Sequence, residues 1–316
     1  MNVLELKSQK RTPEISFIVL TKNSMKTLPR CIRAIKKQRI SKEIIVVDGN
    51  STDNTRRYAK SHVDKLIIDV DSLSLARNLG MLYSSGRYIS FIDSDIVIPD
   101  NWATHMLDLL KGLRKHYSKL VSVSSEYIRC PDKDLNKTWN KVHKPKVGFC
   151  NSGYMQSSIF VADIAKQFII DANRDYSGED LDLFYQMSER GYMHYVDGNM
   201  EVRHYVYPNI IKDSIKSYLY GIDFANVCRK HKKVSDGKSL SFRYFIIMTW
   251  VLGIFALSFF ESLLAYTFIF PYLVALLFSF GNDVGFTDSL KFAIYSGTLM
   301  HFHAYGVFVG MVMFRE

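Results

Sequence analysis

The sequence is poor in cysteine, with four among 316 residues. No two cysteines form a C-x-x-C pair and no histidine stands at zinc-finger spacing, which argues against a disulfide framework and against a zinc module. The first 16 residues hold no apolar core of the length that a signal peptide needs. The sequence therefore predicts free thiols and a first domain that stays in the cytoplasm.

The chain is neither disordered nor collagen-like in composition, since 47% of its residues are hydrophobic. Its length suits one large domain, or one domain with an appendage. Apolar residues are concentrated after about Phe242. The 41 Lys and Arg residues exceed the 31 Asp and Glu residues by 10, which fits a nucleic acid, an anionic membrane surface or an anionic substrate as partner.

The first hundred residues alternate short β-branched runs with stretches of helical periodicity. The predicted strands are Ser16–Thr21, Glu43–Asp48, Leu66–Val70 and Tyr88–Asp93, and the predicted helices are Leu28–Gln38, Ser51–Lys60 and Ser72–Gly86. This alternation predicts an α/β domain with a parallel sheet covered on both faces. Such sheets bind ligands beyond the carboxyl ends of their strands, so we expect Thr21, Asp48 and Asp93 to meet at one edge.

The stretch FIDSDIVIPD ends a predicted strand with two aspartates, Asp93 and Asp95, separated by one residue. Alternating residues of an extended segment point to the same side, so both carboxylates can reach one ligand. Carboxylate oxygens suit Mg²⁺ or Mn²⁺, which keep one or two protein carboxylates and bind substrate phosphates as well. The pattern predicts a metal site, although a turn is the other role for such aspartates.

Two apolar segments, 242–260 and 262–280, are each about as long as a bilayer-spanning helix. They predict a membrane hairpin, and 292–314 is either a third span or an amphipathic helix on a surface. A basic cluster precedes the first segment and predicts a cytoplasmic orientation beside anionic lipids; it comprises Arg229, Lys230, Lys232, Lys233, Lys238 and Arg243.

Five motifs in order carry a family resemblance: VLTKNS, VVDGNSTDNT, ARNLG, FIDSDIVIPD and GED. Over about residues 15–235 the chain resembles the inverting family 2 glycosyltransferases of the GT-A fold, a Rossmann-like fold for nucleotide-diphospho-sugars. Among them it is similar to prokaryotic and archaeal transferases that build lipid-linked glycans. It departs from the frequent Asp-Asp pair at Asp48-Gly49, which leaves the nucleotide base open.

The resemblance implies roles for particular residues. Those matching positions that hold the sugar nucleotide are Thr21, Asn23, Asp48, Asp53, Arg77, Asp93 and Ser94. Asp93 and Asp95 match the metal-binding D-x-D motif, with Asp95 the direct ligand of Mg²⁺ or Mn²⁺. His204 resembles a histidine near the metal or diphosphate, and a structural role for it is equally open.

Glu179 and Asp180 match the acidic pair from which this family draws its catalytic base. We expect Asp180 to be the base and Glu179 to orient the acceptor, whereas Asp182 belongs to the helix N-terminus. The alternative is that all three simply favour the start of a helix. Residues 148–155 are expected to form the acceptor side, with Asn151 and Ser152 as weaker candidates.

The leading interpretation is a GT-A domain over 1–235 followed by a membrane region over 236–316. It would transfer a hexose from a UDP- or GDP-linked donor to a hydroxyl of a lipid-linked or glycolipid acceptor, as a multi-pass protein of the cell membrane with its catalytic domain in the cytoplasm. A polyprenyl-phosphate hexose synthase and a non-catalytic nucleotide-binding scaffold remain as alternatives. No nucleic-acid module is recognisable, so no nucleic-acid partner is expected.

Overall fold

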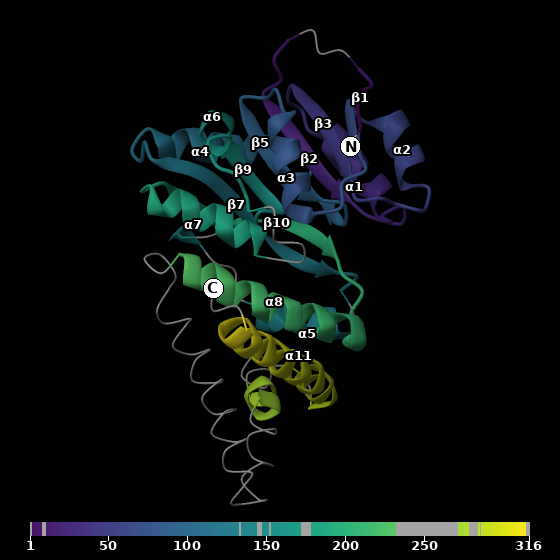
Figure 1. The fold of residues 1–316 in the computed structure, drawn as a ribbon, viewed down its shortest axis with the longest axis vertical. Helices are drawn as coiled ribbons and strands as arrows, with labels where there is room; N and C mark the ends of the chain where they lie inside the picture. Colours follow the sequence, from purple (N-terminus) through teal and green to yellow (C-terminus); the bar gives the residue numbers. More distant parts are fainter. Residues whose placement is uncertain are drawn as a thin grey trace, which may run out of the picture. The chain divides into compact units, whose positions relative to one another are not determined.

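A computed structural model describes residues 2–7, 11–132, 134–143, 147–151, 153–171, 178–231, 271–277, 284 and 286–313 (Figure 1). The chain divides into two compact units. Unit 1 comprises Met1–Ile128, Pro145–Asp175 and Glu179–Tyr205, and unit 2 comprises Arg129–Lys144, Tyr176–Gly178 and Val206–Glu316. Each unit is considered by itself.

One sheet of ten strands organises unit 1. The strands are β1 (Asn2–Glu5), β2 (Ile15–Thr21), β3 (Lys42–Asp48), β4 (Lys65–Ile68), β5 (Tyr88–Asp93), β6 (Ile96–Val97), β7 (Leu120–Cys130), β8 (Gly148–Cys150), β9 (Ser157–Val161) and β10 (Met193–Tyr205). The helices of unit 1 are α1 (Leu28–Lys37), α2 (Thr55–His62), α3 (Leu73–Leu82), α4 (Trp102–Arg114), α6 (Ala162–Ala165) and α7 (Glu179–Glu189).

The central strands are parallel, as the sequence predicts. β2 lies between β3 and β5, with Thr21 beside Asp48 and Leu20 beside Asp93. The carboxyl ends of these three strands therefore form one edge, and the predicted meeting of Thr21, Asp48 and Asp93 there is confirmed.

The rest of the sheet differs from the predicted parallel arrangement. β9 runs antiparallel to both β5 and β7, and β1 is antiparallel to β4. The last residues of β10 pair antiparallel with the short β6. That last pairing brings the segment after β5 against the end of β10.

The parallel strands are apolar on both faces because helices cover both. Phe17 packs in a core cluster with α1 and α4, whereas its neighbour Ile18 packs with α3 and α7 on the other face. This alternation is the period of two expected of a strand, and it explains why the runs are hydrophobic throughout rather than at every second position.

Unit 2 contains α5 (Asp134–Val142), α8 (Ile210–Lys230) and α11 (Phe286–Met313). α8 and α11 cross closely at Gly221, where a Cβ atom would lie 2.2 Å from the carbonyl oxygen of His303. A side chain at this position would push the two helices apart. The predicted domain boundary after residue 235 differs from this division, which assigns α8 to unit 2.

Most of the predicted hairpin, 242–270 and 278–280, lies outside the described residues, and only 271–277 is described there, as helix. The third predicted span overlaps α11. Among the described residues, no helix is both long enough and apolar enough to cross a membrane.

Candidate active site

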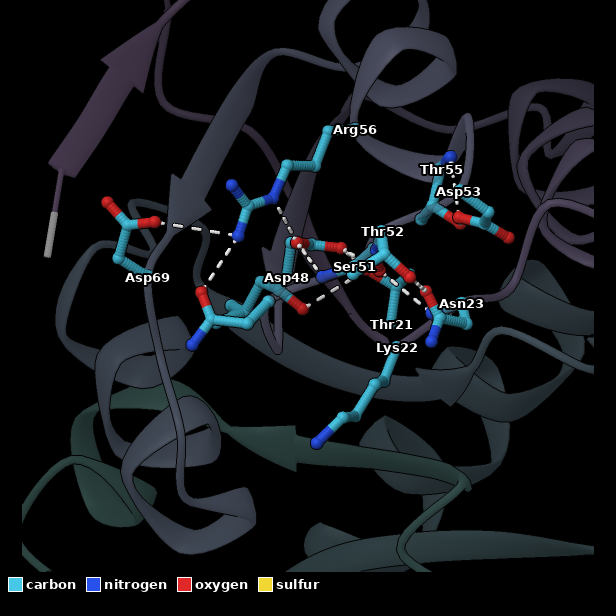
Figure 2. Close-up of polar contacts among 12 residues, drawn as sticks. Thr21, Lys22, Asn23, Asp48, Ser51, Thr52, Asp53, Thr55, Arg56 and Asp69 are labelled. Atoms are coloured by element: carbon cyan, nitrogen blue, oxygen red, sulfur yellow. Dashed lines mark hydrogen bonds and ion pairs between the residues drawn. The ribbon is translucent and has the colours of Figure 1, made fainter.

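A buried carboxylate organises the loops that follow β2 and β3 (Figure 2). Asp48 is fully buried, and its oxygens accept hydrogen bonds from Thr21 Oγ1 at 3.1 Å and from Ser51 N at 2.9 Å. Arg56 Nε lies 2.6 Å from Asp48 Oδ1, which supplies the positive charge that a buried carboxylate requires. Asp48 therefore holds this edge of the sheet together.

The two loops are also tied by Asn23 and Asp53. Asn23 Oδ1 accepts from Thr52 N at 2.8 Å, and Asp53 Oδ2 accepts from Met25 N at 3.2 Å. Hydrogen bonds from Thr55 hold the pKa of Asp53 below its usual value. The structure thus brings together the predicted donor-binding residues Thr21, Asn23, Asp48 and Asp53. In Figure 2 the ammonium group of Lys22 points away from this network.

Arg56 is a site residue that the sequence analysis missed. Besides Asp48, its guanidinium donates to Asn50 Oδ1 at 2.8 Å and lies 3.5 Å from Asp69. Asn50 occupies the segment where the sequence departs from the frequent Asp-Asp pair. A signal was present, because Arg56 lies at the start of α2, soon after the strand-end aspartate. A single sequence, however, does not show which residue an arginine pairs with.

The Asp93-Ser94-Asp95 turn is anchored to the end of β10. Tyr205 N donates to the carbonyl oxygen of Asp95 at 2.9 Å, and His204 is paired in register with Ile96. This pairing places His204 Nε2 3.3 Å from Asp95 Oδ2. His204 therefore lies beside the D-x-D segment, and its predicted place near a metal or diphosphate stays a prediction.

Ser94 is hydrogen-bonded to the loop after β2 and not to another predicted donor-binding residue among those described. Its hydroxyl donates to Ser24 Oγ at 2.9 Å, which ties the D-x-D turn to the loop after β2. Its predicted contact with the sugar nucleotide stays a prediction.

Burial raises the pKa of Asp93, and the neighbouring charge of Asp95 raises it further. The side chain is 37% exposed, but surrounding protein atoms still displace part of its hydration. Arg77 opposes this shift, with Nη2 at 3.8 Å from Asp93 Oδ1. Two carboxylates held together in this way favour a further positive charge at the same edge.

A divalent cation fits this donor set. Within the described ranges, no group of three or more His, Cys, Asp or Glu side chains is placed to hold a metal ion. Mg²⁺ and Mn²⁺ at phosphate sites need only one or two protein carboxylates, since phosphate oxygens and water complete the shell. Asp95, with Asp93 and His204 beside it, supplies that minimal set.

Arg77 links the D-x-D segment to the start of α7. Its side chain is 6% exposed, and its Nε and Nη2 atoms each lie 3.0 Å from Glu179 Oε1. Its remaining nitrogen, Nη1, is buried and has no hydrogen-bond partner among the described residues. One guanidinium therefore joins Asp93 to Glu179 and keeps an unused donor.

The carboxylate of Asp180 has a raised pKa. Burial and then repulsion by Glu179 raise its pKa to about 6, although Arg77 acts in the opposite direction. Leu181 N donates to Asp180 Oδ1 at 2.8 Å. A carboxylate with this pKa is ionised at neutral pH and accepts a proton more readily than an ordinary aspartate.

Glu179 is 4% exposed and is engaged by Arg77. Its predicted role in orienting the acceptor stays a prediction. Asp182 is fully buried and accepts from Gln186 Nε2 at 2.7 Å, in keeping with its predicted place in the helix. On the predicted acceptor side Asn151 is exposed, and Ser152 lies outside the described residues.

Comparison with known families bears on the part of the chain that contains these loops. Residues 16–152 match the family model described as Glycosyl transferase family 2. This segment is similar to the glycosyltransferases of family 2. The match ends before Glu179 and Asp180, so the roles of those two residues are not carried by it.

Curated relatives match this chain over a limited length. The UDP-Glc:alpha-D-GlcNAc-diphosphoundecaprenol beta-1,3-glucosyltransferase WfgD of Escherichia coli is 32% identical over 101 residues, which is 30% of this chain and 38% of the relative. Glycosyltransferase AglE of Haloferax volcanii is 29% identical over 110 residues, which is 32% of this chain and 36% of the relative. The match thus spans little more than a third of each relative.

A solved structure supports the fold over a greater length. The mannosyltransferase PcManGT from Pyrobaculum calidifontis, in complex with GDP-Man and Mn²⁺, superposes with a TM-score of 0.60 at 13% identity and covers 97% of this chain and 89% of that chain. At that identity the likeness shows the fold alone. It confirms the predicted α/β GT-A-like fold.

Proposed function

We propose that the protein is a metal-dependent inverting glycosyltransferase. It transfers a hexose from a nucleoside-diphosphate sugar to a hydroxyl group of a lipid-linked or glycolipid acceptor. The observation that carries the proposal is the position of Arg77, which lies 3.0 Å from Glu179 and 3.8 Å from Asp93. Through it, the D-x-D segment and the acidic pair belong to one electrostatic cluster of unit 1.

The donor is proposed to bind at the carboxyl ends of β2, β3 and β5. The loops tied by Asp48 and Asn23 would hold the nucleoside. Nη1 of Arg77, which has no partner among the described residues, would donate a hydrogen bond to a phosphate oxygen of the donor. Asp95 would hold Mg²⁺ or Mn²⁺, with Asp93 and His204 beside it. A bound cation supplies charge neutralisation for the leaving diphosphate.

Asp180 is proposed as the general base. The acceptor hydroxyl forms a bond to the anomeric carbon while the bond from that carbon to the diphosphate oxygen breaks, and the hydroxyl proton passes to Asp180. With a pKa near 6, Asp180 is mostly ionised at pH 7. Glu179 acts on this step by holding Arg77.

A membrane location and a lipid-linked acceptor are part of the proposal. They are supported by the two apolar segments within 242–280 and by the basic residues before them. The relative WfgD is named for a diphosphoundecaprenol acceptor, which is an acceptor of this class. The catalytic unit would face the cytoplasm, where sugar nucleotides are available.

The test combines detergent-purified protein, a panel of UDP- and GDP-linked sugars, Mn²⁺ and a membrane lipid extract. We expect release of one nucleoside diphosphate, dependent on the cation and stimulated by the extract, with the sugar recovered on a lipid in the inverted anomeric configuration. A product cleaved by mild acid to free polyprenyl phosphate would identify a polyprenyl-phosphate hexose synthase instead. No release from any donor would refute the transferase assignment.

A further inference from the structure

Most of the large apolar side chains that the described residues expose belong to unit 2. Three of them lie in the first turns of α8: Ile210 is 42% exposed, Ile211 is 71% exposed and Ile215 is 55% exposed. Ile211 and Ile215 are four residues apart and so occupy one side of the helix. Single exposed apolar side chains are common on protein surfaces, but several side by side indicate an interaction surface.

Two lysines form a second stripe on the same turns. Lys212 and Lys216 are exposed, are also four residues apart, and each follows directly after one of the isoleucines. The Lys216 ammonium lies 5.2 Å from the ring centroid of Tyr220. The acidic residue of these turns, Asp213, is engaged within unit 2, because it accepts from Asn209 N at 2.7 Å and from the Tyr295 hydroxyl.

The hydrogen bond between Tyr295 and Asp213 also places α11 beside these turns. Ile294, the neighbour of Tyr295, is 51% exposed, and Leu290, one helical turn earlier, is 42% exposed. We call Ile210, Ile211, Ile215, Lys212 and Lys216 the Ile–Lys face. It combines apolar side chains with positive charge, and the carboxylate of Asp213 beside it is already hydrogen-bonded.

We propose that the Ile–Lys face rests on an anionic lipid bilayer. The isoleucines would enter the boundary between headgroups and acyl chains, and Lys212 and Lys216 would lie among the lipid phosphates. An interfacial helix is recognised by this pairing of an apolar stripe with flanking lysines. A protein partner with a purely apolar patch would not account for the two lysines.

The sequence after α8 agrees with this partner. The helix ends with Arg229 and Lys230, and the chain continues with further basic residues and an apolar segment of bilayer length from 242. Both ends of α8 therefore carry positive charge suited to anionic headgroups. The inference adds a docking face in the described part of unit 2 to the proposed membrane anchor, and it does not depend on transferase activity.

The test uses the full chain reconstituted in vesicles, with a small environment-sensitive fluorophore on an Ile210→Cys variant. Leu82→Cys is the matched control, since Leu82 is 69% exposed at the end of α3 in unit 1. The wild-type chain treated with the same reagent gives the background from the four native cysteines. In vesicles containing phosphatidylglycerol, we expect blue-shifted emission at position 210 and quenching by acyl-chain spin-labelled lipid, and neither effect at position 82.

A second variant tests the charge. Lys212→Gln with Lys216→Gln, in the Ile210→Cys background, should lower the ratio of docked to undocked label about 30-fold in anionic vesicles, from roughly 1 kcal/mol for each lysine. Both substitutions are on the surface and leave the Asp213 contacts in place. In pure phosphatidylcholine the two forms should behave alike.

Two results would overturn the proposal. Water-like emission at position 210 in anionic vesicles would show that the face does not meet lipid. A blue shift that appears in detergent, grows with protein concentration and ignores the lysine substitutions would show that a second copy covers the face. The test measures label emission without a sugar donor, so its result is independent of whether the protein transfers a sugar.

Discussion

Replacing Asp180 with Asn should make the protein more stable at neutral pH. The change keeps the size of the side chain, and an amide oxygen can still accept the hydrogen bond from Leu181 N. It removes a carboxylate whose charge is opposed by burial and by Glu179. Asp180 is therefore a residue at which stability and the proposed catalytic role conflict.

The magnitude follows from the pKa. The folded-state pKa of about 6 lies above the ordinary value of 3.8 by about two units, and each unit corresponds to 1.36 kcal/mol, so the ionised side chain costs up to about 3 kcal/mol. The sign is that of a raised carboxyl pKa. The cost is absent below about pH 3.8, grows as the pH rises toward 6, and is constant above that.

The assay is urea unfolding of the wild type and the Asp180→Asn variant between pH 4 and pH 8, followed by tryptophan fluorescence, to which the fully buried Trp102 of unit 1 contributes. We expect the variant to gain about 2–3 kcal/mol above pH 6.5 and almost nothing at pH 4. Sugar transfer by the variant should fall by more than about a hundredfold. In the wild type, kcat/KM should rise through an apparent pKa near 6.

Asp182→Asn is the matched control. Asp182 lies on the same turn of α7, but its carboxylate is held by Gln186, so this variant should retain transfer within a few-fold. An Asp180→Asn variant that is less stable than the wild type at pH 7.5, or whose stability difference does not change with pH, would contradict the assigned electrostatics. Transfer that survives in Asp180→Asn would contradict its role as base.

Three further substitutions test other parts of the site. Arg77→Met should destabilise the protein by about 3–5 kcal/mol in urea unfolding, because Glu179 stays buried without its partner. Adding Glu179→Gln should recover part of that loss. If nothing is recovered, the ion pair is not the cause of the loss. Arg56→Met should lower the free energy of unfolding by about 1–3 kcal/mol, less than the loss of a fully buried pair, since Arg56 is 33% exposed. Arg57→Met, at an exposed position of the same helix, should be neutral when both variants are compared by thermal unfolding. Equal effects of the two substitutions would argue against the Asp48 contact. His204→Gln should weaken Mn²⁺ activation on the order of 10–100-fold in titrations of transfer rate against Mn²⁺, and an unchanged midpoint would remove His204 from the metal site.

The first half of the fold could be predicted because its signals are local. The strands ending at Thr21, Asp48 and Asp93 are β-branched runs stopped by polar residues, and βαβ connections force them to be parallel. The antiparallel strands β7, β9 and β10 were harder to predict from the sequence, because their pairing joins residues far apart in the chain. β6 has two residues and carries no periodicity at all.

The site was predictable as a set of residues but not as a set of contacts. Spacing placed Asp93 and Asp95 together, and the family resemblance added Arg77 and the acidic pair. Nothing in one sequence indicates that Arg77 is bound to Glu179 or that Arg56 neutralises Asp48, since such pairs join separate segments. The placement of Asp95 against His204 depends on the β6–β10 pairing, which the sequence alone does not reveal.

The central claim is that the carboxyl ends of β2, β3 and β5 hold a nucleoside diphosphate through a cation at Asp95. The most direct measurement is calorimetric titration of UDP and GDP into the wild type and an Asp95→Asn variant, each with and without Mn²⁺. We predict that one nucleotide binds the wild type tightly only when Mn²⁺ is present, and that Asp95→Asn removes this enhancement. Binding that is equally tight without the cation, or unchanged in Asp95→Asn, would contradict the claim.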